Sequence, residues 1–100
     1  MPEEIQEIQE ILLPGEKLSE EKKNNLDLIS RVGSELYQKN KDFIKEKIKD
    51  NWFVLIEPIS GTLMAYSDQL KLYEYASKKF PDKVFFSLGL LKDNFLEYVR

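Results

Sequence analysis

The segment from residues 52 to 66 restricts the fold more than any other part of the chain. It reads Trp52-Phe53-Val54-Leu55-Ile56, then Glu57-Pro58-Ile59-Ser60-Gly61, then Thr62-Leu63-Met64-Ala65-Tyr66. β-Branched and aromatic residues dominate both ends, and the Pro/Ser/Gly stretch between them suits a tight turn. The pattern predicts a β-hairpin. Because apolar side chains occupy both faces of its first strand, we expect that strand to be central in a sheet.

A helix and a third strand are expected after the hairpin. Ser67 or Asp68 can cap the helix, Pro81-Asp82 ends it, and the strand follows at residues 84–88. A right-handed crossover places this third strand against the first, which gives the strand order 2-1-3. One face of the helix is expected to carry Leu70, Tyr73, Ala76, Ser77 and Phe80, with Leu72 and Tyr75 near its margin.

Two helical segments are expected before the hairpin. Apolar residues spaced by three and four predict an amphipathic helix over residues 3–13, which Pro14-Gly15 ends. A long helix is expected from Ser19 to about Lys49, either bent at Gly33 or projecting beyond the core. The expected fold is therefore α+β: a helical arm and a long helix followed by a ββαβ unit with a three-stranded sheet. We divide the chain into an arm, residues 1–15, and a single domain, residues 16–100.

The amino-acid composition argues against several classes of function. The 100 residues include no cysteine and no histidine, which removes thiolate nucleophiles and the commonest general base and metal ligand. We therefore expect a protein that is not an enzyme and has no cofactor and no metal. A net charge of −3 argues against nucleic acid as a partner. The acidic start and the lack of a long apolar run predict a cytoplasmic protein with no membrane partner.

Two groups of charged residues suggest alternatives. Glu57 and Asp68 flank the second strand and could serve a small carboxylate-dependent hydrolase, although each also suits a local role in a turn or a helix cap. A lysine cluster could bind phosphates, but interleaved Asp42 and Glu46 favour a solvated helix face. The cluster consists of Lys39, Lys41, Lys45, Lys47 and Lys49.

The hairpin motif resembles a family of small uncharacterised bacterial proteins, best known from cyanobacteria. The resemblance is carried by Trp52-Phe53-x-x-Ile56-Glu57-Pro58-x-Ser60-Gly61 and by the later Lys79-Phe80-Pro81-Asp82, and it covers roughly residues 26 to 90. The family's Leu-Asn-Glu-Thr-Gly-like tail is replaced here by Leu91-Lys92-Asp93-Asn94-Phe95. The resemblance implies the same helix, hairpin, helix and strand order, and no particular activity.

The expected function is protein interaction. The arm is amphipathic and acidic, so it fits a contact with another protein better than a membrane surface. We therefore expect a non-catalytic module that acts as a homodimer or as the small subunit of a complex, with an antitoxin-like partner of a neighbouring enzyme as the alternative. Its contact surface is expected to be the arm, the projecting part of the long helix, or a sheet edge, for which the strands at residues 62–66 and 84–88 are the candidates. The candidate interface residues are Ile5, Ile8, Ile11 and Leu12.

Overall fold

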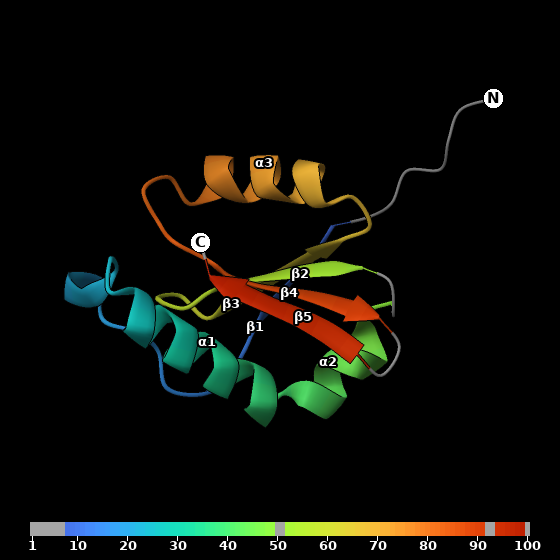
Figure 1. The fold of residues 1–100 in the computed structure, drawn as a ribbon, viewed down its shortest axis with the longest axis horizontal. Helices are drawn as coiled ribbons and strands as arrows, with labels where there is room; N and C mark the ends of the chain where they lie inside the picture. Colours follow the sequence, from blue (N-terminus) through green and yellow to red (C-terminus); the bar gives the residue numbers. More distant parts are fainter. Residues whose placement is uncertain (1–7, 50–51, 92–93, 100) are drawn as a thin grey trace.

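A computed structural model describes residues 8–49, 52–91 and 94–99, with side chains to residue 88. The chain forms an α+β fold in which a five-stranded antiparallel sheet lies between helices (Figure 1). Its strands are β1 (Gln9–Leu12), β2 (Phe53–Glu57), β3 (Thr62–Tyr66), β4 (Phe86–Leu91) and β5 (Asn94–Val99). The helices are the short 3-10 turn η1 (Glu20–Lys22), α1 (Leu26–Lys39), α2 (Lys41–Lys47) and α3 (Gln69–Lys79). α3 covers one face of the sheet, and α1 and α2 cover the other.

The strand order is β1-β3-β2-β4-β5. The expectation of three strands is wrong, because β1 and β5 extend the sheet on its two sides. Within it, β3, β2 and β4 are neighbours in that order, and α3 crosses over β2 to connect the outer two. The third strand begins two residues later than expected, at Phe86, because Lys83–Phe85 lead into it without regular pairing.

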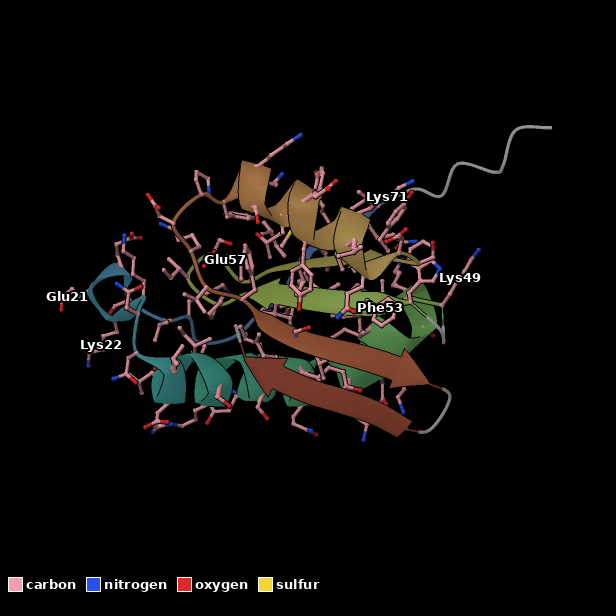
Figure 2. The ribbon with its side chains drawn as sticks, turned by 45° about the horizontal axis from the view of Figure 1, so that its top comes forward. Glu21, Lys22, Lys49, Phe53, Glu57 and Lys71 are labelled. Carbon is pink, nitrogen blue, oxygen red and sulfur yellow. The ribbon has the colours of Figure 1, made fainter. Side chains whose placement is uncertain are left out.

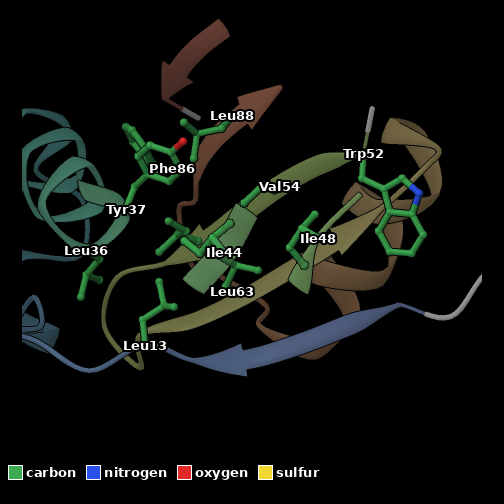
Figure 3. Packing of buried hydrophobic residues seen from close by; sticks show 12 residues of the cluster. Leu13, Leu36, Tyr37, Ile44, Ile48, Trp52, Val54, Leu63, Phe86 and Leu88 are labelled. Carbon is green, nitrogen blue, oxygen red and sulfur yellow. The ribbon is translucent and has the colours of Figure 1, made fainter. Parts of the chain in front are cut away.

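The central strand β2 is buried on both faces, as its sequence predicts. Val54 and Ile56 belong to the cluster under α1 and α2, whereas Leu55 belongs to the cluster under α3. Figure 3 shows the first cluster, in which Tyr37 of α1 and Phe86 of β4 lie side by side between helix and sheet. Alternating side chains on one strand therefore supply both halves of the core.

The long helix expected from Ser19 to Lys49 is interrupted twice. Ser19 precedes only η1, and α1 begins later, where the Asn25 side chain accepts a hydrogen bond from Leu28 N at 3.1 Å. The break between α1 and α2 falls at Asn40, not at Gly33. Gly33 is instead buried against Phe86, so the missing side chain allows close packing rather than a bend.

The helix expected over residues 3–13 is wrong where the structure describes it. Gln9–Leu12 form strand β1, which pairs antiparallel with β3 in the register Gln9↔Ala65 to Leu12↔Thr62. A helical spacing and an alternating one coincide over so few residues, and pairing with β3 decides between them. Strand β1 and the domain expected to begin at residue 16 thus share one sheet, while residues 1–7 of the expected arm lie outside the described residues.

Candidate functional site: the β1 edge

Strand β1 forms one edge of the described sheet. On its inner side, Leu13 N donates a hydrogen bond to Gly61 O at 2.7 Å, directly continuing the β1–β3 register. Backbone hydrogen-bonding direction alternates along an antiparallel strand. Gln9 and Ile11 therefore direct their N–H and C=O groups toward β3, and Glu10 and Leu12 direct theirs away from the sheet. In the part of the chain that the structure describes, no strand lies beyond them.

The side chains of β1 alternate between the two faces. Leu13 is buried and Ile11 is half-buried, and both pack on the cluster under α1 and α2. Glu10 and Leu12 lie on the α3 face, where Glu10 Oε1 accepts a hydrogen bond from Lys79 Nζ at 2.8 Å. Leu12 is 71% exposed, and Figure 3 shows β1, in blue, along the outer side of the sheet.

A shallow groove of about 270 Å³ adjoins this edge on the α3 side. Its lining consists of Glu10, Ile11, Leu12, Thr62 and Lys79. α3 ends at Lys79, and Leu12 stays largely exposed beside that residue. The edge therefore offers outward backbone groups together with an apolar side chain and an ion pair.

The other end of β1 is fixed by the turn between β2 and β3. Leu18 N donates to Pro58 O at 3.0 Å, and Lys17 Nζ donates to Leu13 O at 2.9 Å and Gly15 O at 3.1 Å. Gly61 adopts a φ of +75°, which favours glycine, and a Cβ there would lie 2.2 Å from Lys17 Cε. These contacts hold residues 13–18 across the turn and so fix the direction of β1.

Glu57 and Asp68, the carboxylates considered for hydrolysis, are not brought together. They lie at opposite ends of β3, and each has a local role. The buried Glu57 carboxylate accepts hydrogen bonds from Ile59 N at 3.0 Å and Ser60 N at 2.8 Å, at the β2–β3 turn visible in Figure 2. Asp68 caps α3 by accepting from Lys71 N at 3.2 Å. This arrangement provides no paired acid and base.

The remaining charged features are surface contacts. In the lysine cluster, Lys47 lies 5.6 Å from the ring centroid of Phe43, and Lys49 lies 5.6 Å from that of Trp52. Elsewhere, Lys83 Nζ donates to Glu20 Oε2 at 2.9 Å. That hydrogen bond is the main cause that lowers the pKa of the Glu20 carboxyl and raises the pKa of the Lys83 ammonium.

The predicted interface residues therefore have different surroundings. Leu12 is exposed, Ile8 and Ile11 are half-buried, and Ile5 lies outside the described residues. Leu70, expected on the main apolar face of α3, is instead 75% exposed, and Leu72, expected at the margin of that face, takes the core position. The sheet edges expected at residues 62–66 and 84–88 are wrong, because β3 and β4 are inner strands of the described sheet and β1 forms an edge instead. The sequence signal for β1 was weak: only Ile11 and Leu13 alternate with exposed positions.

Comparisons with known proteins found no relative of this chain. The chain matched no protein-family model, and searches of curated proteins and of solved structures returned no match. Among the described residues, no helix is both long enough and apolar enough to cross a membrane. Within the same residues, no three acidic side chains lie close enough together to hold a metal ion.

Proposed function

We propose that this protein is a non-catalytic interaction module that binds another protein chain through the β1 edge, as a homodimer or as the small subunit of a complex. The observation that carries the proposal is Leu12, a large apolar side chain that is 71% exposed on an edge strand. Edge strands commonly bind extended segments by adding a strand to the sheet. Backbone hydrogen bonds then supply affinity, and alternate side chains supply selectivity.

The composition of β1 supports this function. Natural proteins protect free edges with charged side chains, especially lysine, with proline, with a bulge or by keeping the edge strand very short. Gln9–Leu12 contain neither lysine nor proline, and their pairing with β3 is regular through all four residues. The negative charge of Glu10 is paired with Lys79, which reduces its repulsion of an incoming strand. β1 is short, but within Gln9–Leu12 it has no proline and no bulge, and its one charged side chain is paired, so its outward backbone groups can accept a further strand.

The proposal retains Ile8, Ile11 and Leu12 as interface residues but assigns them different tasks. Leu12 supplies apolar contact area on the α3 face, whereas Ile11 anchors β1 to the core. The resemblance of the hairpin to the bacterial family adds no catalytic activity that would compete with a binding role. An antitoxin-like partner of a neighbouring enzyme is one form that a small subunit of this kind can take.

The test compares two exposed leucines. Leu12→Pro removes an outward N–H and replaces the leucine side chain by a smaller ring, without taking a hydrogen bond from the β1–β3 ladder. Leu70→Asp changes an equally exposed leucine on α3 and serves as the matched control. Leu12→Asp provides a second edge variant in case proline distorts the strand.

Each protein is purified from its native cell in mild salt, and its mass is measured by light scattering and its associated chains by mass spectrometry. We expect wild type and Leu70→Asp to form the same assembly, and both Leu12 variants to lose it while remaining folded by circular dichroism. An assembly that survives both Leu12 changes, or a monomeric wild type with no stoichiometric partner, would contradict the proposed function.

A further inference from the structure

We draw no further inference here: the strongest candidate, the largely apolar groove of about 400 Å³ between α3 and the segment leading into β4, carries none, because the lysine that lines it, Lys83, already pairs with Glu20 and nothing in the described part of the structure shows what covers the groove.

Discussion

Gly33 of α1 lies so close to Phe86 of β4 that a Cβ atom on Gly33 would stand 2.4 Å from Phe86 Cγ. At an exposed helical site, replacing glycine by alanine stabilises a protein by about 1 kcal/mol. Here the added methyl group must displace a fully buried ring, and overpacking of a core costs about 1–3 kcal/mol. The contact with Phe86 therefore makes this glycine-to-alanine substitution destabilising, whereas at an exposed helical site it would be stabilising.

We predict that Gly33→Ala lowers the free energy of unfolding by about 1–2 kcal/mol, measured by urea denaturation. The exposed Gln38→Ala on the same helix should change it by less than about 0.5 kcal/mol. The double variant Gly33→Ala/Phe86→Leu should lose less free energy of unfolding than the sum of the losses in the two single variants. Stabilisation by Gly33→Ala alone would show that α1 does not pack on β4 as described.

Asn40 connects the break between α1 and α2 to the segment that follows β1. Its Nδ2 donates to Leu36 O at 2.8 Å and to Pro14 O at 3.2 Å, and the residue is 7% exposed. Aspartate has the same shape but cannot donate, so Asn40→Asp should lower the free energy of unfolding by about 1–3 kcal/mol. Asn25→Ala, which removes the side-chain cap of α1, serves as the comparison and should lower the free energy of unfolding by about 1 kcal/mol. An unchanged urea midpoint for Asn40→Asp would argue against the link to Pro14.

Glu57 stabilises the β2–β3 turn with both carboxylate oxygens, which accept from Ile59 N and Ser60 N. Glutamine keeps one acceptor and directs an amide group at a backbone N–H, so Glu57→Gln should cost about 1.5–3 kcal/mol. Asp68→Asn should cost less than about 0.5 kcal/mol, because asparagine caps a helix equally well. Urea denaturation of both variants checks the contrast, and equal losses would contradict these local roles.

The Glu20–Lys83 ion pair predicts that the stability of the folded protein depends on pH in the acidic range. Because the pKa of Glu20 is lowered below its ordinary value of 4.5, its contribution to stability is present above that value. The contribution is lost as the pH falls through the lower pKa of the folded state. We expect the Glu20 carboxyl to titrate at a higher pH in Lys83→Met than in wild type, measured by NMR in low salt. An identical midpoint in the two proteins would mean that the pair does not form in solution.

The hairpin and its surroundings could be predicted because their signals are local. Pro58 and Gly61 mark the turn, and the apolar run of residues 53–56 indicates burial on both faces, which Val54 and Leu55 confirm. The handedness of the crossover then placed β4 beside β2, since that rule needs only the order of the elements.

The candidate edge could not be predicted because its signals depend on partners distant in sequence. Ile8, Ile11 and Leu12 suit one side of a helix until β3 is known to pair with them. Gly33 looked like a point of bending, because the contact with Phe86 is invisible in the chain alone. β5 was missed for the same reason: it is identified by its pairing with β4.

The most direct test of the β1 edge as the binding surface is amide hydrogen exchange along residues 9–13, measured by NMR at low and high protein concentration. If β1 is the binding surface, the amides of Ile11 and Leu13, which face β3, exchange slowly at both concentrations. Those of Glu10 and Leu12 should exchange rapidly when the protein is dilute and become protected when it is concentrated. Rapid exchange at Glu10 and Leu12 at both concentrations, in a protein whose measured mass shows it to be assembled, would show that the β1 edge is not the binding surface.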